Sequence, residues 1–276
     1  MNLTVSLRAG NYAVDISNPC DISIPLVFND ANPVCWGAPM ARAKTYCSDG
    51  FVGDTRQGGS CNVAEYHIIP HCQGTHTECV GHITNQPITI HHLRNILIPS
   101  TLITVIPSVL DDVSDRYFPD CYGSDFVITR SALESQLQKQ KSDFSQGLII
   151  RTLPNDATKK TRNYLHQLPP FLTLDAIAYI TQLGVQHLLV DIPSVDRIMD
   201  GGHLRVHRHF WGITPGSYDV DPEAASQKTI TEMVFIPEHI ADGYYLMNLQ
   251  FPPFVADVAP CRPLLYKILQ SPEVST

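Results

Sequence analysis

The chain has 276 residues, 43% of them hydrophobic, and a formal net charge of −8 at pH 7. This length allows one large domain or two small ones. The negative charge disfavours nucleic acids and anionic membranes as partners. No apolar run reaches the roughly 18 residues of a membrane-spanning helix, and the first residues lack the pattern of a signal peptide. We therefore expect a cytoplasmic protein.

The eight cysteines are scattered along the chain and form no Cys-x-x-Cys pair. This spacing argues against a zinc ribbon and against a thioredoxin-like site. In a reducing cytosol we expect most of them to be free thiols.

The first quarter of the chain is rich in turns. Residues 21–26 alternate polar and apolar side chains, which predicts a short strand. The Pro- and Gly-bounded loop 33–39 contains Trp36, which either walls a pocket for a flat substrate or only anchors the loop. Residues 48–60 are polar and predict a surface loop, and residues 65–69 predict a strand.

The next segment, residues 70–82, holds three His, two Cys and one Glu. Pro70 and the pair Gly74-Thr75 argue against a helix. In an extended chain alternate residues share a face, so Cys72, His76 and Glu78 would point the same way. A thiol, an imidazole and a carboxylate on one side of a strand form half of a metal site. The alternative is a polar loop in which these residues merely pack.

Downstream, the pattern predicts strands alternating with helices. The predicted strands are residues 96–98 and 102–106, separated by Pro99, then 147–151 and 187–191. Ser131 would cap one helix, and Thr173 would cap a second that Gly184 ends. Such βαβ units indicate an α/β domain with a parallel segment. We expect a single domain over residues 1–276.

Residues 191–196 follow a predicted strand at its carboxyl end, where α/β proteins usually place their sites. On a helix, His203 and His207 would lie one turn apart, either as a ligand pair or on an exposed basic face. Residues 212–228 read as a loop, either a lid or a segment without a role. Residues 245–249 and 263–269 predict closing strands.

Gly74-Thr75-His76, followed by an acid at 78 and His82, resembles the signature of the cyclase-like metal hydrolases. This family includes bacterial-type kynurenine formamidase and isatin hydrolase. The chain departs from the signature at three positions, where Cys72 replaces His, Glu78 replaces Asp and Val80 replaces Pro. Segments 21–26, 191–196 and 231–236 resemble further family segments in the same order.

The resemblance implies an α/β fold with a mixed β-sheet or barrel-like core and flanking helices. It also implies a divalent ion with five ligands: Cys72, His76, Glu78, His203 and Glu232. Glu238 is the fallback for Glu232, and His207 has no metal role in this comparison. His82 would transfer protons.

The implied reaction is hydrolysis of a small amide, such as an aryl formamide or a cyclic amide, with water activated by zinc or, alternatively, manganese. Trp36 and Trp211 would contact the substrate. A homodimer or higher homo-oligomer is expected. The alternatives are a lactone or ester hydrolase, or a non-catalytic relative that binds a small molecule or a metal.

Overall fold

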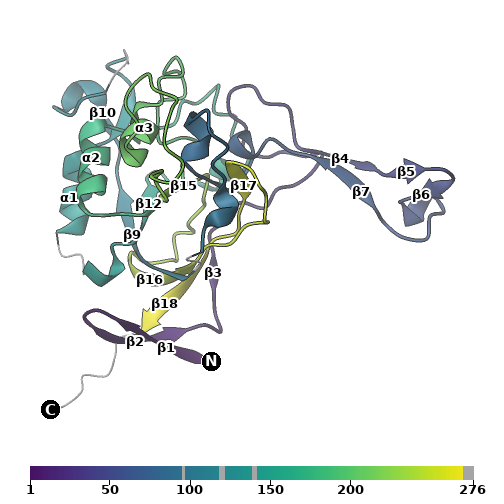
Figure 1. The fold of residues 1–276 in the computed structure, drawn as a ribbon, viewed down its shortest axis with the longest axis horizontal. Coiled ribbons are helices and arrows are strands. Elements are labelled where there is room, and N and C mark those ends of the chain that lie inside the picture. Colours follow the sequence, from purple (N-terminus) through teal and green to yellow (C-terminus); the bar gives the residue numbers. More distant parts are fainter. Residues whose placement is uncertain (95–96, 118–121, 139–141, 270–276) are drawn as a thin grey trace.

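The computed structural model describes residues 1–94, 97–117, 122–138 and 142–269. Its main sheet contains 11 strands in the order β1-β2-β18-β16-β9-β12-β14-β15-β8-β17, with β3 paired to β18 (Figure 1). The strands of this sheet are β1 (Asn2–Leu7), β2 (Gly10–Asp15), β3 (Cys20–Asp21), β8 (His76–Glu78), β9 (Leu97–Val105), β12 (Gly147–Thr152), β14 (His187–Val190), β15 (Thr229–Glu232), β16 (Gly243–Asn248), β17 (Val258–Pro260) and β18 (Leu264–Leu269). The predicted α/β class with a mixed sheet is confirmed.

The centre of this sheet is parallel. Strand β12 pairs in parallel with β9 and β14, and β14 pairs in parallel with β15. Antiparallel strands flank this segment, with β16 on one side and β8 and β17 on the other. The carboxyl ends of the parallel strands therefore meet at one edge, which is where sites in α/β proteins usually form.

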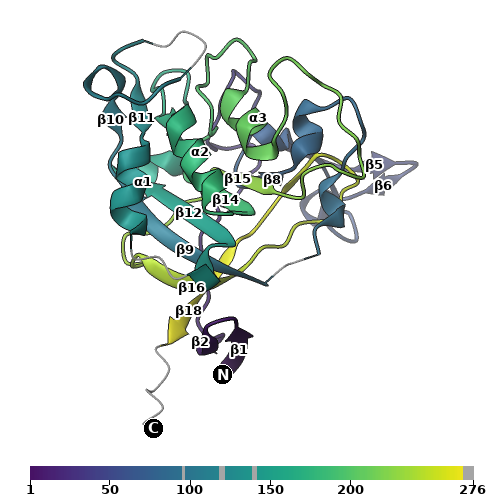
Figure 2. The ribbon, with the colours of Figure 1, turned by 60° about the vertical axis from the view of Figure 1, so that its left-hand side comes forward.

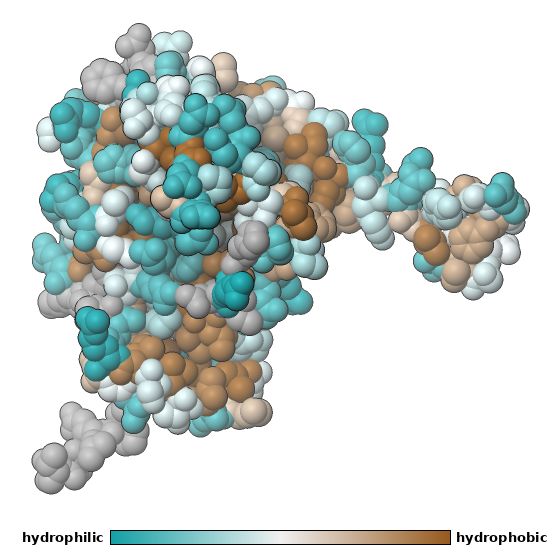
Figure 3. Space-filling model, viewed as in Figure 1, coloured by the Kyte–Doolittle hydropathy of each residue, from teal (hydrophilic) through white to brown (hydrophobic). Residues whose placement is uncertain are grey.

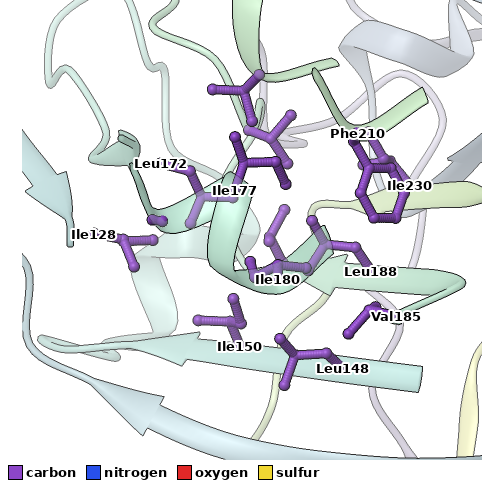
Figure 4. Packing of buried hydrophobic residues seen from close by; sticks show 14 of the residues in the cluster. Ile128, Leu148, Ile150, Leu172, Ile177, Ile180, Val185, Leu188, Phe210 and Ile230 are labelled. Atoms are coloured by element: carbon purple, nitrogen blue, oxygen red, sulfur yellow. The ribbon is translucent and has the colours of Figure 1, made fainter. Parts of the chain in front are cut away.

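Three α-helices cover one face of the sheet: α1 (Arg130–Leu137), α2 (Leu174–Gln182) and α3 (Arg205–Trp211) (Figure 2). Ile177 and Ile180 of α2 pack over Leu148 and Ile150 of β12 (Figure 4). The alternate residue Ile149 is buried on the opposite face of the same strand. Strand β12 is thus covered on both sides, as its continuous apolar run predicts.

Two smaller parts complete the fold. Strands β10 (Ser108–Val109), β11 (Phe126–Ile128) and β13 (Phe171–Leu172) form a small sheet. Strands β4 (Arg42–Thr45), β5 (Cys47–Ser48), β6 (Phe51–Val52) and β7 (Ala64–His67) form an arm that extends away from the body (Figure 1). Apolar side chains are exposed along this arm, among them Tyr46, Val63 and Tyr66 (Figure 3).

Several predicted boundaries are wrong for local reasons. Strand β9 runs through Pro99, which lies opposite Leu246 of β16 and one residue before the first residue that pairs with β12, Ser100. The cap of α1 is Thr129, whose Oγ1 accepts a hydrogen bond from the Ala132 N–H, and not Ser131. Residue 96 of a predicted strand lies outside the described residues.

Two further corrections concern the candidate metal segment. Residues Pro70–Cys72 form a 3₁₀ turn, with Pro70 at its first position, so Cys72 does not lie on the strand with His76 and Glu78. Helix α3 begins at Arg205, so His203 precedes it and shares no helical face with His207.

None of the described helices has the length and apolar character needed to cross a membrane.

Candidate metal centre

The register between β8 and β15 brings together three buried ionisable side chains. Glu232 pairs with His76, and Ile230 pairs with Glu78. His76 and Glu78 share one face of β8, while the Thr77 hydroxyl on the other face lies 2.8 Å from the Thr231 hydroxyl. His76 Nε2 lies 3.4 Å from Glu232 Oε2, and the exposed fractions of His76, Glu78 and Glu232 are at most 3%.

Helix α3 adds a second imidazole to this set. His207 Nε2 lies 2.8 Å from Glu78 Oε1 and 3.6 Å from Glu232 Oε1. Its other ring nitrogen, Nδ1, lies 2.6 Å from Asp196 Oδ2. Asp196 also accepts hydrogen bonds from the backbone N–H groups of Val206 and His207. A carboxylate on the far nitrogen of an imidazole is the usual support of a metal-binding histidine.

A third group lies nearer the surface. His71 Nε2 is 3.5 Å from Glu78 Oε2 and 3.1 Å from Asp257 Oδ2. His82 Nε2 is 3.8 Å from Glu78 Oε2, and His82 Nδ1 is 3.5 Å from Asp257 Oδ2. The rings of His71 and His82 stack with their centroids 4.2 Å apart. Glu78 thus faces both the buried and the outer histidines.

These side chains suit a divalent cation. Within the described part of the chain, three sets have potential ligand atoms within 4.8 Å of one another: His76, Glu78 and Glu232; Glu78, His82 and His207; and His71, His82 and Asp257. His76 Nε2 is buried and has no hydrogen-bond partner among these residues, although it faces a carboxylate. An ion between imidazole and carboxylate would satisfy both groups.

The charges within the cluster shift the pKa values of Glu78 and His207 in the direction opposite to that of burial. Burial alone would raise the pKa of Glu78, but the neighbouring His82 and His207 outweigh it and lower this pKa. Burial alone would lower the pKa of His207, but Glu78 and Asp196 raise it well above its ordinary value. These directions favour a protonated His207 between the ionised carboxylates of Glu78 and Asp196. A divalent cation would supply the same charge compensation.

Three of the five predicted ligands, His76, Glu78 and Glu232, lie together in this cluster. His203 is exposed and belongs to none of the three sets of ligand atoms, whereas the buried His207 belongs to one of them. Glu238, the fallback for Glu232, is exposed.

Cys72 is half-buried and belongs to none of the three sets of ligand atoms. The neighbouring Cys35 thiol is the main cause that lowers the pKa of Cys72 to about 7. The charges of His71 and His76 act in the same direction. Cys72 is therefore a thiol that ionises readily beside the cluster.

A pocket of about 630 Å³ opens above the cluster. Its lining includes Glu78, His82, His207 and Glu232, together with Trp36. The Trp36 indole N–H donates a hydrogen bond to the Ile198 carbonyl at 3.1 Å. Trp211 is 4% exposed and packs in the core beside the His207 ring, so it does not line this pocket.

Two residues of the candidate site differ from the sequence prediction. The resemblance favours His203 over His207. The sequence carries no signal for Asp257, because it stands alone in a loop without a motif around it. Only the pairing of β17 with β8 brings it to the cluster.

Comparison with solved structures gives the same fold. A potential metal-dependent hydrolase with cyclase activity is 19% identical, with 91% of this chain and 98% of that chain covered and a TM-score of 0.57. An isatin hydrolase bound to the product analogue thioisatinate is 14% identical, with 91% and 93% covered and a TM-score of 0.56. Isatin hydrolase A from Labrenzia aggregata is 13% identical, with 90% and 93% covered and a TM-score of 0.59.

A search of curated proteins gave no significant match. The Cyclase family model, however, matches residues 14–197, which is more than half of the chain and includes the Gly-Thr-His motif with the strand β8. The chain belongs to the Cyclase family.

Proposed function

We propose that this chain is a metal-dependent hydrolase that cleaves the carbon–nitrogen bond of a small amide, such as an aryl formamide or a cyclic amide. The observation that carries the proposal is the buried set of His76, Glu78 and Glu232, with His207 beside it, three members of which (Glu78, Glu232 and His207) line a pocket. Membership of the Cyclase family supports it. So do structural neighbours named as a metal-dependent hydrolase and as isatin hydrolases.

His76, Glu78, Glu232 and His207 would hold the ion, and His207 replaces His203 in this proposal. Cys72 remains a proposed ligand, because its readily ionised thiol lies in the same pocket. Nitrogen and sulfur donors favour zinc, whereas a set dominated by carboxylates would suit manganese. Zinc is therefore the first metal to test.

A bound divalent ion would lower the pKa of its water from 15.7 to about 7 and polarise a carbonyl oxygen. His82 lies at the edge of the pocket with 26% of its side chain exposed, so it is accessible to a substrate. We propose that His82 Nε2 takes a proton from the attacking water or delivers one to the leaving nitrogen. The Trp36 ring would contact a flat substrate.

The first test is the metal content of the purified protein, followed by a screen of aryl formamides, cyclic amides and lactones. We expect close to stoichiometric zinc, amide hydrolysis, and loss of activity on treatment with a chelator. Glu232→Gln should lose both metal and activity, whereas Glu238→Gln, at an exposed position, should lose neither.

Two results would redirect the assignment. Turnover of lactones or esters without amides would keep the metal chemistry and change the substrate class. Stoichiometric metal without any turnover would indicate a binding protein that is not an enzyme. Absence of metal from a folded protein, even after incubation with zinc or manganese, would contradict the proposal itself.

We also propose that the chain forms a homodimer or higher homo-oligomer. The exposed side chains of Tyr46, Val63 and Tyr66 on the projecting arm support this, because isolated two-stranded ribbons are marginally stable in water. Light scattering would show a monomer if this part of the proposal is wrong.

A further inference from the structure

Asp257 reaches the cluster through a defined sheet register. Strand β17 pairs with β8 so that Val258 lies opposite Glu78 and Pro260 lies opposite His76. Asp257, one residue earlier, therefore lies beside the residue that follows Glu78. The Cys79 N–H donates a hydrogen bond to the Asp257 carbonyl at 3.0 Å, which fixes the backbone of Asp257 at this point.

The turn that carries His82 is built to accept this close approach. Residues Val80–Ile83 form a 3₁₀ turn, in which the His82 N–H donates to the Cys79 carbonyl at 3.0 Å. A Cβ atom at Gly81 would lie 3.3 Å from the Asp257 Cβ and 2.0 Å from the Ile88 carbonyl oxygen. Only glycine fits there, chiefly because of the Ile88 carbonyl, and the turn that carries His82 thereby passes close to the Asp257 side chain.

The side chain of Asp257 faces the two outer histidines. Its Oδ2 atom lies 3.1 Å from His71 Nε2 and 3.5 Å from His82 Nδ1. The opposite nitrogen of His82, Nε2, faces Glu78 Oε2 at 3.8 Å. The His71 ring stacks on the His82 ring and limits its rotation. His82 is thus held between a carboxylate on one side and the candidate metal centre on the other.

We propose that Asp257 is a positioning residue for His82. A carboxylate beside Nδ1 favours the tautomer with the proton on that nitrogen, which leaves the lone pair of Nε2 directed at the centre. The contact between Asp257 Oδ2 and His82 Nδ1 at 3.5 Å also favours one orientation of the ring, and the stacked His71 ring supports it. This inference rests on the proposed function, because it acts through the role of His82 in proton transfer.

The test compares Asp257→Asn, Asp257→Glu and the matched control Asp49→Asn, which lies in an exposed turn of the arm. The substrate is the amide that the wild-type protein turns over best. In Asp257→Asn we expect unchanged metal content and KM, with kcat lowered by about 10- to 100-fold, less than the ~10²–10⁴ of a lost acid–base group. Asp257→Glu should recover part of the lost kcat, and Asp49→Asn should match the wild type.

A double-mutant cycle separates positioning from an independent role. Because Asp257 is proposed to act through His82, adding Asp257→Asn to His82→Ala should lower kcat no further. If the reductions in kcat of the two single variants multiply in the double variant, the proposal is overturned. An unchanged kcat in Asp257→Asn would also overturn it. Loss of a metal ion in Asp257→Asn would also overturn it, since Asp257 would then be a ligand together with His71 and His82.

A spectroscopic measurement keeps the test independent of turnover. In the protein labelled with ¹⁵N-histidine, the His82 signal, assigned with His82→Ala, should report a proton on Nδ1 in the wild type and a different tautomer distribution in Asp257→Asn. An identical tautomer in both proteins contradicts the positioning role. Failure of the proposed function shows itself separately, as a wild-type protein without metal or without turnover.

Discussion

At the scale of single residues, burial distinguishes His207 from His203. The His207 imidazole is 2% exposed and contacts the carboxylates of Glu78 and Asp196, which fix its position. The His203 imidazole is exposed and precedes the helix. The resemblance to a family signature could not make this distinction, because it assumed that the helix begins at His203. The helix begins at Arg205 instead.

The first prediction compares these two histidines. His207→Ala should remove most of the bound metal, because it deletes the imidazole that contacts Glu78 and leaves Asp196 without its partner. His203→Ala should keep the metal content of the wild type. Elemental analysis of both purified variants, with circular dichroism as a check of folding, decides the question. Metal loss confined to His203→Ala would restore the assignment from the family signature.

The second prediction concerns the two neighbouring residues in the turn before β8. His71 Nε2 already faces Asp257, whereas the Cys72 thiol ionises readily. Cys72→Ser should therefore weaken zinc binding, while His71→Ala should keep it. Competition with a chromophoric chelator measures the affinity of each variant. Unchanged zinc affinity in Cys72→Ser would show that the thiol is not a ligand.

The third prediction uses His187, which is buried away from the centre at the start of β14. Burial lowers its pKa to about 4, below the ordinary value of 6.5. Between these pH values the unfolded chain binds a proton that the folded chain does not, so stability falls as the pH falls through this window. At pH 4 the loss amounts to about 3 kcal/mol.

His187→Gln should remove this part of the pH dependence, because glutamine does not titrate and its amide can still bond with the Thr229 hydroxyl, as His187 Nδ1 does at 2.9 Å. Urea unfolding at pH 4 and pH 7 gives the free energy of unfolding for both proteins. Equal pH dependence in wild type and variant would assign the acid sensitivity to other groups.

At the scale of elements, the sequence predicts helix ends that depend on capping by neighbouring residues. The Thr173 cap, the following helix α2 and the stop at Gly184 are all confirmed, since the Thr173 hydroxyl accepts a hydrogen bond from the Ala176 N–H and Gly184 has a φ of +77°. The predicted extended alternation from Cys72 to Glu78 is wrong, because a turn that begins at Pro70 contains Cys72 and only His76–Glu78 form a strand. The geometry of a turn depends on contacts with the rest of the fold, and the spacing of residues in the sequence does not reveal these contacts.

The fourth prediction concerns Thr75, which precedes β8 and whose hydroxyl forms hydrogen bonds with two segments distant in the sequence. Its hydroxyl accepts a hydrogen bond from the Ile24 N–H at 2.8 Å and donates one to the Met233 carbonyl. Thr75→Val keeps the shape and removes both bonds, so the free energy of unfolding should fall by about 1–3 kcal/mol. Thr75→Ser, the matched control, should lose less than half of that amount. An unchanged free energy of unfolding in Thr75→Val would show that the two hydrogen bonds of the hydroxyl do not stabilise the fold.

At the scale of the whole molecule, the candidate centre is assembled from segments far apart in the chain. His76 and Glu78 come from β8, His207 from α3, Glu232 from β15 and Asp257 from the loop before β17. The motif around β8 could be recognised from the sequence because its residues are contiguous. Asp257 could not be, because its contact with His82 depends on how β17 pairs with β8.

This assembly leads to the last prediction. An ion held by β8, α3 and β15 binds the folded state and has no equivalent site in the unfolded chain, so binding should stabilise the fold. The gain follows the free ion concentration and is about 4 kcal/mol at 1,000 times Kd. Removing the metal with a chelator should therefore lower Tm, and adding zinc should restore it.

The matched variants locate the effect at the cluster. Glu232→Gln should abolish the increase in Tm with zinc, because it removes the carboxylate beside His76 Nε2. Glu238→Gln, six residues further on and exposed, should retain it. Differential scanning calorimetry over a series of free zinc concentrations measures the response. An increase of the same size in both variants would place the stabilising ion elsewhere in the molecule, because the carboxylate beside His76 Nε2 would then be dispensable for binding it.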